Sequence, residues 1–268
     1  MRVRQPAVAG SFYDADSERL ARDVRRYVPE GLPRVTAIGA IVPHAGYVYS
    51  GPVAGAVYGR LELPSVAVVL CPNHTGHGVG AALDPSAIWR TPVGDVPLAR
   101  RLADRILDAA PSLEPDEGAH RREHSLEVQL PFLRLLRPDI AIVPICLGVI
   151  SLPLCREVGE AIARVVRDEE ERPILLASSD MNHQESRKIG RPKDDLALAR
   201  IEALDAEGLF RTVFAESITM CGVLPATALL FAAQALGATR AEVVSRRDSG
   251  DETGDVSSVV GYAGVVIT

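Results

Sequence analysis

The stretch AIGAIVPHAGY, residues 37–47, contains the pattern that decides the fold. An apolar run of strand length, Ala37–Val42, is followed at once by Pro43 and His44. Three further runs have the same length and character, and they are Val66–Cys71, Ile140–Cys146 and Ile174–Ala177. Continuous apolar runs of this kind are typical of strands that are buried on both faces, as in a parallel sheet.

Amphipathic patterns lie between these runs and predict helices that cover the sheet. Leu98, Leu102 and Ile106 recur four residues apart, and similar patterns occur at residues 126–133, 158–165 and 196–204. The alternation predicts an α/β sandwich with a mostly parallel central sheet flanked by helices. The final segments, Ala241–Arg246 and Val259–Thr268, predict a closing pair of strands. Loops are expected at Asp84–Val96 and Gln184–Asp195, where Pro, Gly or polar residues gather.

Composition and charge exclude several classes of protein. The 268 residues are 47% hydrophobic and 24% charged, and no repeat or linker divides them, so we expect one domain over residues 1–268. The net charge is −6 with no basic block, which argues against nucleic-acid binding. No apolar run is long enough for a targeting or membrane segment, and four scattered cysteines do not form a disulfide framework. These features predict a cytoplasmic protein with reduced thiols.

Four of the six histidines directly follow predicted strands. His44 follows the first strand, His74 and His77 follow the second, and His183 follows Ile174–Ala177. In open α/β sheets, ligands bind beyond the carboxyl ends of the strands. A single histidine there is usually a structural hydrogen-bonding residue, but His44 and His74 on two strand ends together favour metal binding. His77 lies further into its loop, where we expect it to face solvent or to support the site.

Other residues around these strand ends could take part in the chemistry. Asp180 and His183 lie three apart, so the carboxylate could orient an imidazole that acts as a general acid or base, or Asp180 could cap the next turn. His124 and Glu127 are spaced to share a helix face, and His124 is the better candidate to line the pocket. Cys221 precedes an apolar helix, whose dipole would favour the thiolate and make it reactive or metal-binding.

Several longer motifs carry a resemblance to a known family. The chain resembles the Memo family, the Memo-like protein B of the AmmeMemoRadiSam grouping, which is related in fold to the LigB-type extradiol dioxygenases. The matching motifs follow the order of the family and span almost the whole chain. They are RQPAVAGSFY (4–13), PHAGYVYSGPVAG (43–55), CPNHTG (71–76), REHSLEVQLPFL (122–133), SSDMNH (178–183), MCG (220–222) and SSVVGYAGV (257–265).

The resemblance implies a metal site made by His44, His74 and Cys221, with Asp180 and His183 beside it. In the dioxygenases the third ligand is a carboxylate, whereas this chain has Cys221 at the matching position. A thiolate is softer and can be oxidised, so iron is the first expectation and copper or zinc also fit. Ring cleavage of a catechol therefore does not follow from the resemblance.

Three functions are consistent with such a site. The first is a metal-dependent redox enzyme of dioxygenase-like type with an unknown small-molecule substrate, in which His183 moves a proton, Asp180 orients it and His124 supports the site. The second is a non-catalytic binding or adaptor protein that uses the pocket for a peptide. For this reading the family grouping implies radical-SAM and AMMECR-type proteins as partners in a shared pathway. The third is a zinc hydrolase, although the sequence has no H-E-x-x-H helix or nucleophile elbow.

Overall fold

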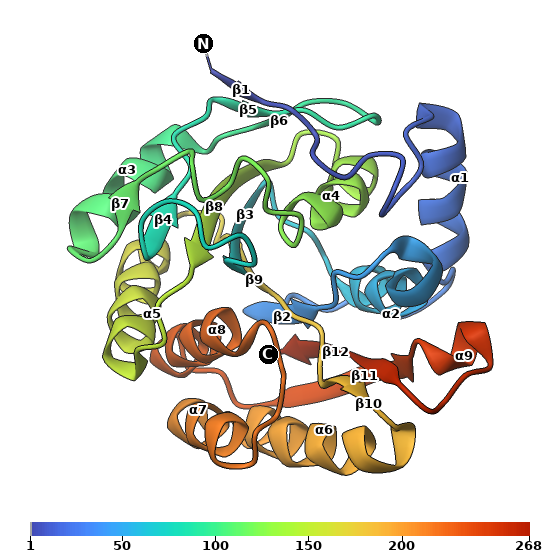
Figure 1. The fold of residues 1–268 in the computed structure, drawn as a ribbon. Coiled ribbons are helices and arrows are strands. Elements are labelled where there is room, and N and C mark those ends of the chain that lie inside the picture. The colour runs from blue at the N-terminus through green and yellow to red at the C-terminus, as the bar shows by residue number, and fades with distance from the viewer. Residues whose placement is uncertain (1) are drawn as a thin grey trace.

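The computed structural model describes residues 2–268, in which a nine-stranded sheet forms the centre of the molecule (Figure 1). Across the sheet, the strands are β10 (His183–Glu185), β12 (Val259–Ile267), β2 (Gly39–Val42), β9 (Ile174–Ser178), β3 (Val66–Pro72), β8 (Ala141–Leu147), β4 (Ala81–Leu83) and β7 (Glu114–Pro115), with β11 (Ala241–Asp248) paired to β12. A smaller sheet contains β1 (Val3–Arg4), β5 (Ile88–Trp89) and β6 (Val96–Pro97).

Helices cover both faces of the large sheet (Figure 1). They are α1 (Ser17–Tyr27), α2 (Tyr47–Arg60), α3 (Arg100–Ala109), the 3₁₀ helix η1 (Glu127–Gln129), α4 (Leu130–Leu136), α5 (Leu152–Arg167), α6 (Arg187–Glu202), α7 (Ala206–Ala215), α8 (Val223–Ala235) and the short α9 (Gly250–Thr253). Side chains of β3 alternate between two cores, because successive residues of a strand point to opposite faces. Val68 and Leu70 pack with α5 and α8, whereas Ala67 and Val69 pack with α1, α2 and α4.

The sheet is mixed, which corrects the expectation of a mostly parallel one. The four central strands, β2, β9, β3 and β8, are parallel, as their continuous apolar runs predicted. The margins differ: β12 is antiparallel to β2, β10 and β11, and β4 is antiparallel to β8. Only residues 73–80 connect β3 to β4. That length is too short for the crossover that a parallel pair needs, so the chain turns back. The closing pair predicted at the C-terminal end is confirmed as β11 and β12.

Two predicted loops contain regular structure. The segment 184–195 is mostly helix, because α6 begins at Arg187 and keeps Pro192 within it. Lys188, Arg191 and Asp195 are exposed on its outer side while Asp194 is buried, and a helix this rich in polar residues resembles a loop in composition. The stretch 84–96 contains β5, which pairs in parallel with β1, and there the guanidinium of Arg4 lies 4.5 Å from the centre of the Trp89 ring.

The central strands end along one edge of the sheet and thereby position the candidate site. His44 follows β2, His74 follows β3, and Asp180 follows β9. Since β2, β9 and β3 are adjacent and parallel, their carboxyl ends bring these three residues together. No helix within residues 2–268 is long and apolar enough to cross a membrane.

Candidate metal centre

Three side chains from separate parts of the sequence converge at the carboxyl edge of the sheet. His44, His74 and Cys221 each offer a ligand atom, and these atoms all lie within 4.8 Å of one another. The Cys221 Sγ is 3.1 Å from the His44 Nε2. We refer to these three residues as the candidate metal centre. The resemblance of the sequence implied these same three residues as metal ligands, and the structure brings them together.

His44 is held rigidly by its neighbours. Its ring is buried, its Nδ1 lies 2.9 Å from the Ser178 Oγ, and its backbone N–H donates to the Asp180 Oδ1 at 2.7 Å. The Nε2 is therefore the ring nitrogen that faces Cys221. Burial, followed by the charges of His124 and His74, lowers the pKa of His44 well below its usual value. The ring is therefore neutral at pH 7, which is the form that binds metals.

His74 is oriented by a buried carboxylate, Glu123. The His74 backbone N–H donates to one oxygen of Glu123 at 2.6 Å, and the His74 Nδ1 donates to the other at 2.8 Å. Burial by itself would raise the pKa of Glu123, but hydrogen bonds from His74 and Ser125 outweigh it and lower this pKa to about 2. The carboxylate is thus ionised, and it leaves the His74 Nε2 free. A carboxylate behind a ligating histidine is a common support in metal sites.

Cys221 lies just before α8, and its environment corrects one prediction. The helix begins at Val223 with Gly222 as its N-cap, and the Asp180 N–H donates to the Cys221 Sγ at 3.3 Å. Burial, with the nearby charge of Asp180, raises the pKa of the Cys221 thiol well above its usual value. Desolvation therefore outweighs the helix dipole that was expected to favour the thiolate. A metal ion would displace the thiol proton on binding.

His124 lies beside the candidate metal centre, as predicted, although it is not on a helix. Its ring stacks on that of His74 with 4.6 Å between centroids, and it contacts Phe12 at the same distance. Burial is the main cause that lowers the pKa of His124. His74, Glu123 and His124 form a second group that could hold a metal ion. Hydrogen bonds from His74 and Ser125 already occupy the Glu123 carboxylate, so this group fits a metal less well.

Asp180 and His183 are close to the centre but do not act as the expected pair. The Asp180 carboxyl accepts from His44, and burial raises its pKa to about 6. Thr219 orients the His183 ring instead: its carbonyl lies 2.9 Å from the His183 Nδ1. His183 opens the extended strand β10. The hydrogen bond from His44 also shows that Asp180 is no simple turn cap.

The two residues left undecided by the sequence lie outside the centre. His77 is exposed, as expected for a residue further into its loop. Glu127 is buried and binds the N-terminal segment, with the Ala7 and Val8 N–H groups, the Tyr13 hydroxyl and the Arg4 guanidinium as its donors. Because η1 begins at Glu127, His124 precedes the helix and the two residues do not share a helix face.

Sequence reasoning assigned no role to several supporting residues. Glu123 holds His74, and Ser178 contacts His44 while its hydroxyl donates to the Ser125 carbonyl at 2.6 Å. The Gln129 amide donates to both the Ser178 Oγ and the Pro43 carbonyl. Glu123 could have been found as a carboxylate beside His124 in a histidine-containing motif. Ser178 and Gln129 gave no such signal, because hydroxyl and amide groups are common at strand ends and in helices.

Two imidazoles and one thiolate, supported from behind by hydrogen bonds, suit iron, copper or zinc. The fold and this donor set define the class: an α/β protein with a candidate His–His–Cys metal centre at the edge of a mixed sheet. The family model described as "Memo-like protein" matches residues 4–266. The chain belongs to the Memo-like family, which confirms the resemblance found in its sequence.

Relatives of nearly the same length support this membership. A "MEMO1 family protein" of Aquifex aeolicus is 41% identical, with 99% of each chain covered. Another, from Methanosarcina acetivorans, is 39% identical, with 100% of each chain covered. Among solved structures, the uncharacterized Escherichia coli K12 protein JW3007 is 17% identical with a TM-score of 0.47, covering 76% of this chain and 86% of its own. That likeness is too distant to establish a shared fold.

Proposed function

We propose that this protein binds one metal ion through His44, His74 and Cys221 and acts as a metal-dependent redox enzyme of dioxygenase-like type on a small molecule. Iron is the first expectation, and copper and zinc are the alternatives. The observation that supports the proposal is the convergence of three ligand atoms within 4.8 Å of one another. A chance cluster of polar residues would not require both rings to be oriented from behind, as Ser178 and Glu123 orient them.

The donor set fits a metal ion that keeps open positions. Two histidines and one cysteine supply three ligands, which leaves coordination sites for a substrate or a small oxidant. Iron or copper in such a site would supply one-electron redox chemistry, which no side chain of the centre provides alone. The chain's own contribution is to hold the His44 Nε2 3.1 Å from the Cys221 Sγ, with a ligand atom of His74 within 4.8 Å of both, and to desolvate that half-buried thiol.

The surrounding residues have separate roles in this proposal. His183 is the general acid–base, since Thr219 holds its Nδ1 and leaves the Nε2 of a half-buried ring free to accept or return a proton. Asp180 positions His44 through the backbone N–H of that residue. His124, between Phe12 and His74, forms a wall of the centre that excludes water.

The test is the metal content of protein purified without oxygen, measured by mass spectrometry. We expect close to one iron per wild-type chain, and less than a tenth of that in His74→Ala and Cys221→Ser. His77→Ala and Cys155→Ala are the matched controls: His77 is an exposed histidine of the same loop, and Cys155 is a buried thiol of α5. Both should keep the wild-type metal content.

The identity of the metal distinguishes the redox enzyme from the zinc hydrolase. Zinc as the resident metal would favour hydrolysis over redox chemistry. The proposal is overturned if the purified wild-type protein contains no metal and then takes up neither iron, copper nor zinc. The pocket would then serve to bind a peptide or partner.

A further inference from the structure

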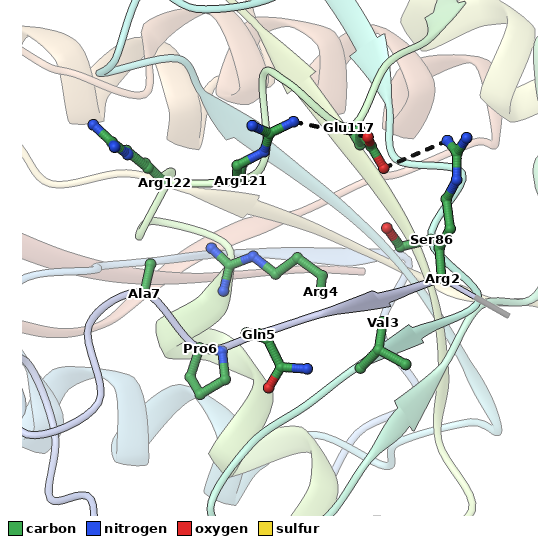
Figure 2. Close-up of a pocket in the computed structure, with 10 residues that line it drawn as sticks. All are labelled: Arg2, Val3, Arg4, Gln5, Pro6, Ala7, Ser86, Glu117, Arg121 and Arg122. Carbon is green, nitrogen blue, oxygen red and sulfur yellow. Dashed lines mark hydrogen bonds and ion pairs between the residues drawn. The ribbon is translucent and has the colours of Figure 1, made fainter.

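A cavity of about 850 Å³ lies between the N-terminal segment and the loop that precedes Glu123 (Figure 2). Residues 2–7 line one side, Glu117, Arg121 and Arg122 line the other, and Ser86 also lines it. No residue of the candidate metal centre is among them. The volume is within the range of pockets that hold small molecules, roughly 300–1,000 Å³.

The lining of this cavity is positive in a chain that is negative overall. Arg2, Arg4, Arg121 and Arg122 line it, with Glu117 as the acidic residue among the lining side chains. Buried Glu127 neutralises Arg4. Glu117 is shared between Arg2 at 3.4 Å and Arg121 at 3.7 Å, and Arg122 pairs with no acidic side chain within residues 2–268. Three cations against one carboxylate leave two positive charges, whereas the whole chain carries −6.

Arg4 fixes the two walls of the cavity relative to each other. Its guanidinium donates to the His120 carbonyl at 3.1 and 3.2 Å and to the Glu123 carbonyl at 2.7 Å, while it lies over the Trp89 ring. These bonds tie strand β1 to the loop that carries Arg121 and Arg122. Because Arg4 is buried and fully bonded, it is part of the scaffold, and the exposed arginines are the groups available to a ligand.

Glu117 already shows how an anion fits between these arginines. Its carboxylate lies between the guanidinium groups of Arg2 and Arg121 (Figure 2). Guanidinium groups present parallel N–H donors that match the oxygens of a carboxylate or a phosphate. An anion that entered the cavity would meet the same donors, while the exposed Arg122, whose guanidinium points away from Glu117, adds positive charge to the same wall (Figure 2).

We propose that this cavity is a binding site for a small-molecule oxyanion with two negative charges. The two charges balance the two cations that Glu117 leaves unpaired. Phosphate and a dicarboxylate share this chemistry. The site does not depend on the metal-binding function proposed above, because it uses none of the same side chains. It is therefore tested in metal-free protein.

Isothermal titration calorimetry of the full chain at pH 7.5 and low salt tests the site, with inorganic phosphate and succinate as the two probes. We expect saturable binding of at least one probe with one site per chain. The tighter of the two identifies the ligand as phosphate-like or dicarboxylate-like. Arg121→Gln and Arg122→Gln should each weaken binding by about tenfold, as expected for the loss of a charged hydrogen bond.

Two further variants distinguish a built site from general attraction to positive charge. Glu117→Gln should tighten binding severalfold, because it removes the competing carboxylate and frees Arg2 and Arg121. Arg25→Gln is the control: Arg25 is an exposed residue of α1, outside the cavity lining, and should leave affinity unchanged. The proposal is overturned if neither probe saturates, if Arg25→Gln weakens binding as much as Arg122→Gln, or if Glu117→Gln fails to tighten it.

Discussion

Two buried glutamates, Glu123 and Glu127, lie four residues apart and serve different regions of the molecule. Glu123 accepts from the backbone N–H and the Nδ1 of His74 and thereby orients a candidate ligand. Glu127 accepts from Ala7, Val8, Tyr13 and Arg4 and thereby anchors the N-terminal segment. The comparison shows that one short segment can support a site and the fold with the same chemical group.

The partners of the two carboxylates determine what each loss would cost. Glu127 pairs with a buried guanidinium, which stays charged at any ordinary pH. Glu123 is bonded to an imidazole and to Ser125, which can both be neutral. Removal of Glu127 therefore leaves a buried cation without its counter-charge, whereas removal of Glu123 leaves neutral donors. The first should mainly affect stability, and the second should mainly affect the site.

Glu127→Gln should have the largest effect on stability. An uncompensated charge at Arg4, whose side chain is 4% exposed, should lower the free energy of unfolding by about 3–5 kcal/mol. Urea denaturation followed by circular dichroism measures this change. Glu117→Gln is the control, since it removes an exposed ion pair with Arg2 and should cost less than about 1 kcal/mol. A similar small loss in both variants would contradict the anchoring role.

A third buried carboxyl, Asp194, differs from Glu123 and Glu127 because few hydrogen-bond donors surround it. It accepts from the Asn182 N–H at 2.8 Å and lies 3.5 Å from Arg246, and burial raises its pKa to about 6. Between pH 4 and 6 the unfolded chain therefore loses this proton while the folded protein keeps it. Stability contributed by this group falls as pH rises through that window.

Asp194→Asn should abolish this fall in stability. The free energy of unfolding of the variant, relative to wild type, should rise by up to about 3 kcal/mol from pH 4 to pH 7. Urea denaturation at each pH measures the difference. Asp195→Asn is the matched control, because Asp195 is 61% exposed and pairs with the same arginine. Parallel pH profiles for Asp194→Asn and wild type would show that this carboxyl is already ionised at pH 4.

The parallel centre of the sheet and the three candidate ligands could be predicted because each has a local signal. Val66–Cys71 is continuously apolar, and His74 follows it by three residues, so strand and ligand are both visible in sequence. The antiparallel margins could not be predicted in the same way. The direction of β4 depends on a connection too short for a crossover, and β10 is only three residues long.

The supporting residues were harder to predict because their partners are distant in sequence. Glu127 is bonded to residues more than 110 positions away, and Ser178 meets His44 across 134 positions. The pairing of Asp180 with His183 was predicted from their proximity in sequence, but the ring is oriented by Thr219. The state of Cys221 was predicted from the helix dipole, while its burial was not visible. Spacing identifies residues on one strand end, but it does not specify their hydrogen-bond partners or their desolvation.

Glu123→Gln should weaken metal binding with a modest effect on folding. An amide can accept from His74 with only one oxygen and carries no charge, so the ring is held less firmly. Loss of such a partner typically lowers metal affinity by about 10–100-fold. Competition with a chromophoric chelator, using Zn²⁺ as the probe metal, measures the change. Glu117→Gln, in the same segment, should bind as the wild type does, and an affinity of Glu123→Gln within twofold of wild type would remove Glu123 from the site.

Phe12→Leu should have the smallest effect and tests whether the anchored N-terminal segment also shields the centre. The rings of Phe12 and His124 are 4.6 Å apart at 49°, and Phe210 and Phe214 on α7 form a similar pair at 4.7 Å and 53°. Loss of either aromatic contact should cost about 1 kcal/mol of unfolding free energy. Only Phe12→Leu should also uncover His124. In that variant diethylpyrocarbonate should modify His124 severalfold faster than in the wild type, whereas Phe214→Leu should leave the modification rate of His124 unchanged. Equal modification rates of His124 in the two variants would mean that Glu127 anchors a segment with no part in the site. Glu123 would then serve the site alone, and Glu127 would serve only the fold.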